Sequence, residues 1–351
     1  MSTQQRTTKD ILLLIPLSAL SFADPITDIL TLMEYYSAGH KNWFIVGLLF
    51  MITPFPAFWA FFYGTSKNSD ARCAYDMMCL CGCHPFTVAF YRLEAFVVCG
   101  IKKFWKGEEI VKGQYEYDVL KATEQSASFE ALFESAPQLV IQLYVVSVQI
   151  EPVNTIQIIS LPVSFLSLVW AFQEEIPNKP MKYKILDFLT KFFLLSTRLL
   201  AITYFVVGFT WLLIAILVFH FISLRIMHCI WPYANAVKTC TCTCENVLFW
   251  WFFFGSSWIG YEPFDEEGLE TETARKHLRL IHFLSYCVIV LENVIMILLY
   301  YVDFGAPYKT FREWYSLPVT VYVCLFSIIT FVLRFMFVHY FLLNDNYVHP
   351  E

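Results

Sequence analysis

The sequence is poor in charged residues. Asp, Glu, Lys and Arg make up 15% of its 351 residues, whereas 58% are hydrophobic and the mean hydropathy is +0.54. The core of a soluble protein of this length does not need so much apolar surface, so a soluble domain is excluded. The net charge of −6 is small and dispersed, and it gives no reason to expect a nucleic-acid partner. The composition predicts a polytopic membrane protein.

Three kinds of motif are also missing. The sequence has no Walker-type phosphate loop, so we expect no ATP-driven step. No nucleophile and base stand in an arrangement typical of catalysis, so we expect neither an enzyme nor a cofactor. No small-residue cleavage pattern follows the first apolar run, which continues through Asp24 and Asp28. We therefore expect this run to remain as a helix and not to be removed as a signal peptide.

Long apolar runs are abundant. A helix needs about 20 apolar residues to cross about 30 Å of hydrocarbon. Eight such runs lie at about 11–36, 42–63, 129–150, 155–175, 187–207, 209–229, 279–302 and 315–343. Two shorter runs, at about 84–101 and 245–261, are predicted to be half-inserted helices. The expected fold class is an all-α membrane protein with eight spans.

The distribution of Lys and Arg sets the expected orientation. With eight spans both termini lie on one side, and that side collects most of the Lys and Arg residues. The other side has only Lys41, Lys309 and Arg312. Because positive residues favour the cytoplasm, both termini are predicted to be cytoplasmic. Trp43 then lies at the outer interface, where an anchoring role is typical of Trp.

A polar stripe runs through one of the apolar segments. Glu130, Glu134, Gln138 and Gln142 recur every four residues, and each such step turns a helix by about 40°. The four side chains therefore form one slowly slanting line. A carboxylate in hydrocarbon is costly, so the stripe is predicted to face a polar path. The alternative is that these groups pair into a network that only fixes helix packing. Pro137 removes one backbone hydrogen bond and predicts a bend or a freed carbonyl here.

Two other segments carry ionisable groups on one face. Asp24 and Asp28 stack four residues apart, and such close carboxylates must be hydrated, paired with a cation or partly protonated. A salt bridge to a neighbouring helix is an equally simple alternative. Asp187, Lys191 and Arg198 share a face farther along the chain. We interpret the two faces as walls of opposite sign along a path for lipid headgroups.

The order of long runs, cysteine cluster, short run and polar linker occurs twice. Residues 1–175 and 176–351 would then be two related halves of a single membrane domain, a weak internal repeat of the kind seen in transporters. About 160 residues separate each corresponding pair, which are Asp28 with Asp187, Cys83 with Cys244, and Glu134 with Glu292.

Two cysteine clusters are predicted to lie in cytoplasmic segments. They consist of Cys79, Cys81 and Cys83, and of Cys240, Cys242 and Cys244. A reducing compartment argues against disulfides, and the C-x-C spacing lacks the usual C-x-x-C geometry of zinc sites. Thioacylation beside the membrane is one interpretation. Inert thiols and a metal site are the others.

The chain resembles the XK-related proteins from end to end. The resemblance rests on the segments Asp24-Pro-Ile-Thr-Asp28, Phe90-Tyr-Arg92, Leu132-Phe-Glu-Ser-Ala-Pro-Gln-Leu-Val-Ile-Gln-Leu-Tyr144, Ser196-Thr-Arg198-Leu-Leu-Ala201 and Tyr347-Val-His-Pro350. It implies eight spans with two half-inserted helices. For some members it also implies passive phospholipid scrambling at the plasma membrane of dying cells, with exposure of phosphatidylserine. The residues carried over are a gate, Trp43, and a lipid path of Asp24, Asp28, Glu130, Glu134 and Arg198.

Regulation is where the sequence departs from that family. Caspase-activated members carry an Asp-x-x-Asp tetrapeptide in a terminal tail, and neither residues 1–10 nor residues 344–351 contain one. We therefore expect another trigger or an accessory membrane subunit. A scaffold that docks a cytoplasmic lipid-transfer protein is a second candidate function. A small-solute transporter, which the repeat would fit, is a third.

Overall fold

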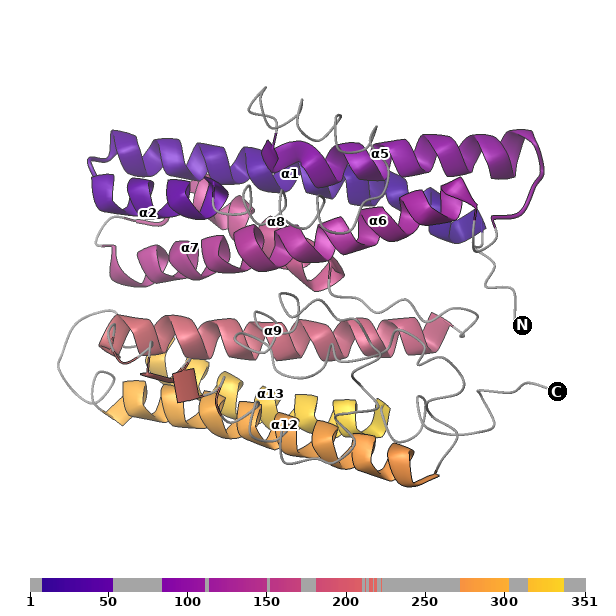
Figure 1. Ribbon diagram of the computed structural model, residues 1–351. Helices are drawn as coiled ribbons and strands as arrows, with labels where there is room; N and C mark the ends of the chain where they lie inside the picture. Colours follow the sequence, from indigo (N-terminus) through magenta and orange to yellow (C-terminus); the bar gives the residue numbers. More distant parts are fainter. Residues whose placement is uncertain are drawn as a thin grey trace. The chain divides into compact units, whose positions relative to one another are not determined.

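The computed structural model describes seven stretches of the chain and a few single residues between 212 and 222 (Figure 1). The stretches are 8–52, 84–110, 114–149, 152–171, 181–209, 272–302 and 315–337. All regular elements within them are helices, in agreement with the predicted all-α class. The chain divides into an N-terminal unit, Met1–Lys179, and a C-terminal unit, Pro180–Glu351. Whether the two halves are repeats stays a prediction.

The N-terminal unit is built around its first helix. α1 packs against α2, α5 and α8, and α7 packs against both α2 and α8 (Figure 1). The helices are α1 (Thr8–Ser37), α2 (Lys41–Ile52), α5 (Thr87–Gly100), α6 (Tyr115–Glu130), α7 (Ala136–Val148) and α8 (Thr155–Ala171). A 3₁₀ turn, His84–Phe86, precedes α5, and π-helical turns, Ile101–Trp105 and Ala131–Ser135, follow α5 and α6.

The described part of the C-terminal unit is a group of three long helices. These are α9 (Met181–Phe209), α12 (Glu272–Tyr300) and α13 (Ser316–Phe337), and each packs against the other two. Leu194, Tyr286 and Ile289 are buried between them, with Phe331 of α13 packed against this cluster.

Three of the described helices are long and apolar enough to cross a membrane. They are Ile11–Ser37, Ile185–Phe209 and Ser316–Met336. The apolar parts of α2, α7, α8 and α12 are shorter. The helical membrane class is therefore supported, while the count of eight spans stays a prediction. The short run predicted at 84–101 is helical throughout. The run at 245–261, and most of the predicted span at 209–229, lie outside the described residues.

One predicted boundary is wrong. The helix expected to begin at about 129 begins at Tyr115, because α6, the π turn and α7 form one continuous helical run that ends at Val148. Residues 115–128 contain Ala, Leu, Lys, Glu and Gln, which favour helix. They are too polar for a hydrocarbon span, so a search for apolar length passes over them.

A tight turn joins α1 to α2. Gly39 has φ of +84°, a left-handed conformation that glycine adopts without steric cost. The His40 N–H donates to the Tyr35 carbonyl at 2.9 Å, and the Gly39 N–H donates to the Tyr36 carbonyl at 3.1 Å. This is the Schellman arrangement that ends many helices. It lets α2 begin at Lys41 and return along α1.

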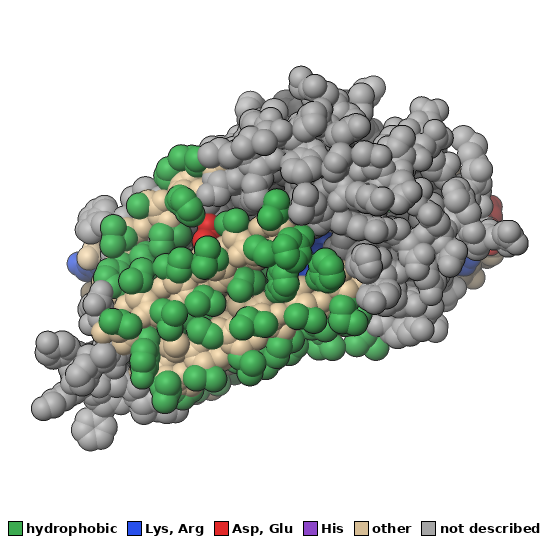
Figure 2. Space-filling view, turned by 90° about the horizontal axis from the view of Figure 1, so that it is seen from below, with side chains coloured by type: hydrophobic (Ala, Val, Ile, Leu, Met, Phe, Trp, Pro, Cys, Tyr) green, Lys and Arg blue, Asp and Glu red, His purple; other side chains and the backbone are tan. Residues whose placement is uncertain are grey.

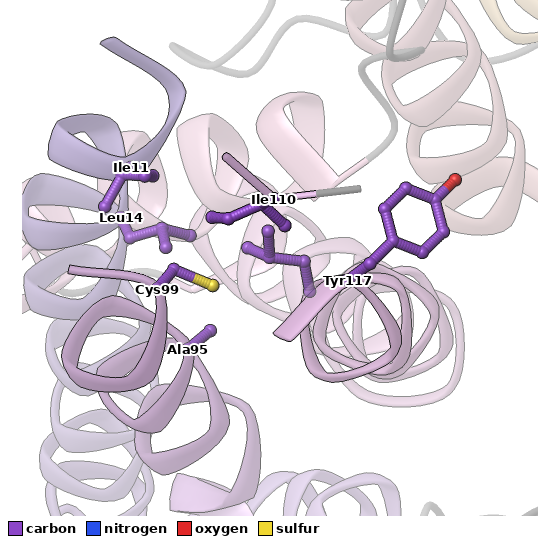
Figure 3. Packing of buried hydrophobic residues seen from close by; sticks show 7 residues of the cluster. Ile11, Leu14, Ala95, Cys99, Ile110 and Tyr117 are labelled. Carbon is purple, nitrogen blue, oxygen red and sulfur yellow. The ribbon is translucent and has the colours of Figure 1, made fainter. Parts of the chain in front are cut away.

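A buried apolar cluster fixes the ends of α1, α5 and α6 against one another (Figure 3). It is made of Ile11, Leu14, Ala95, Cys99, Ile110, Tyr117 and Leu120. Because each of these side chains is at least nine-tenths buried, the cluster gives α5 a fixed position beside the start of α1.

A buried ammonium group strengthens the link between α5 and α6. The Nζ of Lys102 donates to Oε2 of Glu116 and to Oε1 of Gln114, both at 2.9 Å. The hydrogen bond from Lys102 lowers the pKa of Glu116 below its ordinary value of 4.5. Glu116 lies outside the predicted span, so water reaches this pair.

We expect the Lys102–Glu116 pair to stabilise the fold in a pH-dependent way. A lowered pKa favours the ionised, folded form above about pH 4.5, and this contribution is lost as the pH falls through the folded pKa. The variant Glu116→Gln should lower the free energy of unfolding by about 0.5–1 kcal/mol at neutral pH, and by less at acidic pH. Thermal unfolding in detergent measures this difference, with the exposed Glu108→Gln as control. An equal difference at both pH values would contradict the prediction.

Candidate functional site

The two carboxylates of α1 are buried. Asp24 and Asp28 are only 3% and 2% exposed, although no residue on α1 between them carries a positive charge. Both side chains face α8, where the Ser164 hydroxyl donates to Oδ1 of Asp24 and, at 3.4 Å, to Oδ1 of Asp28. A hydroxyl donor therefore takes part of the role that water has for an exposed carboxylate.

The polar face of α8 was not predicted. Gln157, Ser160 and Ser164 are all buried. Together with Ser167 they recur at intervals of three or four residues, which places them on one side of the helix. The Ser160 hydroxyl donates to Oε1 of Gln142 at 3.1 Å. The regular spacing of small polar residues within an apolar run is the signal that could have identified this face.

The predicted stripe on α6 and α7 is buried at all four positions, Glu130, Glu134, Gln138 and Gln142. The Nε2 of Gln142 donates to Oδ1 of Asp28 at 2.7 Å. Ser135, which the stripe did not include, donates to Oδ2 of Asp24 at 3.1 Å. The side chains of α1, α7 and α8 therefore meet in one hydrogen-bonded group.

A π-helical turn interrupts the stripe. The Ala136 N–H donates to the Ala131 carbonyl five residues earlier, instead of four. Pro137 follows and has no N–H to donate. The extra residue in this turn shifts the register between Glu134 and Gln138. The expected backbone irregularity at Pro137 thus takes the form of a wide turn directly beside the carboxylates.

Some buried polar atoms of the stripe lack a hydrogen-bond partner among the described residues. These are Oε2 of Glu130, Oε2 of Glu134 and Nε2 of Gln138. The Oε1 of Gln138 lies beside Gly47 of α2, where an added Cβ would come within 3.4 Å of it and 2.3 Å of Leu32. Glycine at position 47 therefore lets α2 pack closely against Leu32 of α1.

We define the acidic column as the buried polar side chains that α1, α8 and the continuous run from the end of α6 through the π turn to α7 contribute. It consists of Asp24, Asp28, Thr31, Glu130, Glu134, Ser135, Gln138, Gln142, Ser160 and Ser164. Toward the α1–α2 turn, Gln149 and Gln157 exchange hydrogen bonds at 3.1 Å, and Asn154 donates to Glu34.

Trp43 lies at the turn end of the acidic column. Its ring stacks on His40 with a centroid distance of 4.1 Å and meets Tyr35 edge-on at 5.9 Å. It is partly buried and packs against the cluster of Leu32, Tyr35, Met51 and Val145. This position places an aromatic ring beside the column, and its role as a gate stays a prediction.

Arg92 brings a positive charge to the other end of the acidic column. It extends from α5, is 5% exposed, and was not among the predicted path residues. Its Nη1 donates to the Leu17 carbonyl at 3.0 Å and to the Ser21 hydroxyl. Its charge also attracts the carboxylates of Asp24 and Glu130. The sequence signal was its membership of the Phe90-Tyr-Arg92 segment.

The predicted path residues of the C-terminal unit form ion pairs. Arg198 is fully buried, and its Nη2 lies 2.9 Å from Oε2 of Glu292, while its Nη1 donates to Oδ1 of Asn293 at 2.9 Å. Asp187 lies 3.7 Å from Nη1 of Arg334 on α13, whose guanidinium also lies 5.9 Å from the centre of the Tyr286 ring.

The predicted site residues thus belong to two clusters. The acidic column holds those of the N-terminal unit, and the ion-pair cluster of the C-terminal unit holds Asp187, Arg198 and Glu292, with Lys191 also buried. A single path that uses both clusters stays a prediction. Both cysteine clusters, from Cys79 to Cys83 and from Cys240 to Cys244, lie outside the described residues. Within the described stretches no three His, Cys, Asp or Glu side chains gather as metal ligands.

Comparison with known proteins identifies the family of the chain. The family model described as XK-related protein matches residues 12–344, which is nearly the whole chain. No curated protein matches the chain.

We expect the Arg198–Glu292 pair to be a packing element that tolerates exchange of its charges. Arg198→Glu alone should destabilise the protein by about 3–5 kcal/mol, because it leaves like charges buried together. The double variant Arg198→Glu, Glu292→Arg should recover most of this loss, as measured by thermal unfolding in detergent. A double variant as unstable as Arg198→Glu alone would mean that the two side chains do not act mainly through each other.

Proposed function

The chain belongs to the XK-related family, and from this premise we propose that it is a passive phospholipid scramblase of the plasma membrane. The observation that carries the proposal is the acidic column. It holds four carboxylates and several amides and hydroxyls inside a group of helices. A structural network alone would be expected to pair its charges, whereas two of these carboxylates keep a buried oxygen without a partner among the described residues.

The outer surface of the helices suits a hydrocarbon environment. Figure 2 shows one face on which nearly all described side chains are hydrophobic. Along α13, exposed apolar residues recur every three or four positions, at Leu317, Val321, Leu325, Ile328 and Val332. In α9 and α13 the charged groups Asp187, Arg198 and Arg334 are buried, the arrangement expected of ionisable residues within a membrane.

The chemistry of the column fits a lipid headgroup. Phospholipid headgroups carry an anionic phosphate and, in the common zwitterionic lipids, a cationic amine. Carboxylates such as Glu134 can bind the amine, while the Ser135 and Ser164 hydroxyls and the Gln142 amide can donate to the phosphate. These groups would replace headgroup hydration step by step while the acyl chains remain in the bilayer. Movement would be bidirectional, since the sequence has no nucleotide-binding loop.

The finer topology belongs to the same proposal. Eight helices would cross the membrane and two shorter ones would enter it partway, with both termini cytoplasmic by the Lys and Arg distribution. Scrambling in this arrangement would expose phosphatidylserine during apoptosis.

One observation favours a second candidate, a scaffold that docks a cytoplasmic lipid-transfer protein or another partner without moving lipid. In the described part of the C-terminal unit, Arg198 pairs with Glu292 and Asp187 pairs with Arg334. Buried pairs of this kind fix helix packing and need no ligand. The scaffold requires no transport path, so lipid movement in a purified system separates the two functions.

We expect the purified chain in liposomes to expose lipids of the inner leaflet. Lipids labelled with a fluorophore on the acyl chain are quenched by external dithionite only when they reach the outer leaflet. Vesicles with the chain should therefore lose more fluorescence than empty vesicles. Correctly folded protein that moves no lipid would favour the scaffold.

The variant Glu134→Gln should separate a path from a packing role. Removing a buried charge that lacks a donor should raise the free energy of unfolding by about 1–3 kcal/mol, whereas loss of an amine-binding group should slow scrambling about tenfold. The two readouts are thermal unfolding and the dithionite assay, with Glu108→Gln as control. Scrambling at the unaltered rate would contradict the assignment of Glu134 to the path.

A further inference from the structure

A small pocket lies where α5 meets the acidic column. Arg92 and Glu130 line it together with the hydroxyl-bearing Ser21, Ser135 and Ser167, and the remaining wall is Ala and Val. Both charged side chains are more than nine-tenths buried. The pocket has room for about one water molecule. It therefore presents a cation, an anion and hydroxyl donors at one point, beside small residues that leave space.

The anion of this pocket needs a donor. Oε2 of Glu130 is buried and has no hydrogen-bond partner among the described residues. A buried carboxylate oxygen is stabilised best by a positively charged N–H group. An exposed carboxylate would take its donors from bulk water, whereas the pocket beside Glu130 has room for only about one water molecule.

The cation has the geometry for phosphate. A guanidinium offers N–H groups in a planar fork that matches two phosphate oxygens. The Nη1 of Arg92 donates to two neutral groups of α1, the Leu17 carbonyl and the Ser21 hydroxyl. A phosphate could replace these bonds with stronger ones in which both partners are charged.

We propose that Arg92 and Glu130 form a binding site for an aminophospholipid headgroup, with Arg92 on the phosphate and Glu130 on the primary ammonium. This rests on the proposed scrambling function and adds the headgroup class. Phosphatidylethanolamine and phosphatidylcholine share the phosphate, but only the primary ammonium has N–H donors for Glu130. The site therefore discriminates between two lipids that differ only in their N-methyl groups.

Entry of a headgroup requires α5 to move away from α1. The pocket as it stands admits about one water molecule, and the bonds from Arg92 to Leu17 and Ser21 join the two helices across it. A phosphate that takes over Arg92 removes these bonds and so favours the open arrangement. Binding and opening are then coupled through one side chain.

The test compares acyl-labelled phosphatidylethanolamine and phosphatidylcholine in liposomes that contain the full chain. Glu130→Gln should lower the ratio of their scrambling rates about fivefold, and Arg92→Gln should slow both lipids about tenfold, as expected for loss of charge-assisted hydrogen bonds. Arg92→Lys keeps the positive charge but not the planar fork of N–H groups, so its scrambling rates should lie between those of the wild type and Arg92→Gln. The controls Lys103→Gln and Glu94→Gln remove charges of each sign from the same helical run, at a half-buried and an exposed position.

Two outcomes would overturn the proposal. The first is a double variant, Arg92→Gln with Glu130→Gln, that scrambles both lipids at the wild-type rate. Arg92 would then serve only to neutralise the acidic column. If Glu130→Gln slows both lipids equally, Glu130 does not recognise the ammonium.

A second measurement does not depend on transport. Soluble glycerophosphoethanolamine should raise the melting temperature of the wild-type chain more than glycerophosphocholine does. Neither should raise it for the double variant. If this difference in melting temperature is found in a chain that moves no lipid, the headgroup site is supported and the proposed scrambling function is wrong. If lipid moves but the two soluble headgroups raise the melting temperature equally, the proposed headgroup site is wrong and the scrambling function is supported.

Discussion

The arrangement of the N-terminal unit depends on hydrogen bonds to two buried carboxylates. Asp24 and Asp28 leave water only because donors from two other helices reach them, Ser164 from α8 and Gln142 from α7. Burying either carboxylate without such donors would cost far more than the packing of one helix returns. The acids therefore determine which helices must lie beside α1, and with what polar residues. Ser160 extends the same logic, because it holds the Gln142 amide that serves Asp28.

The solvation of the acids is unequal along the acidic column. Around Asp24 and Asp28, hydroxyls and an amide supply donors. Glu130 and Glu134 each retain an oxygen without a donor in the described stretches. Glu130 directly precedes the π turn and Glu134 lies within it, where the backbone departs from regular α-helical register. Attraction for a mobile cationic group is therefore concentrated where the helix is least regular.

Spacing along the chain predicted the residues of the site better than their partners. The stripe from Glu130 to Gln142 was predicted because helical periodicity is local, and all four side chains are buried. The serines of α8 were missed because Ser occurs on any helix face and carries no charge. Arg198 was predicted to lie on a wall opposite the acids of the first half, and the spacing gave no indication that it pairs with Glu292 on α12. Tertiary packing determines such a partner, and the residue spacing within one segment carries no information about which helix packs against it. The polar start of α6 was missed for a different reason, since the apolar-length rule detects spans and not helices.

The two units treat buried charge in opposite ways, and this difference argues for where lipid would interact. In the C-terminal unit Arg198 and Glu292 lie 2.9 Å apart, and Asn293 supplies a further acceptor. A paired charge offers little to a ligand, because binding must first break the pair. In the N-terminal unit the acidic column holds four carboxylates, and the cation that lines the pocket beside Glu130 is Arg92, whose hydrogen bonds also hold α5 to α1. An incoming headgroup gains most where charge is least compensated, so exchange with lipid should begin beside Arg92 and Glu130.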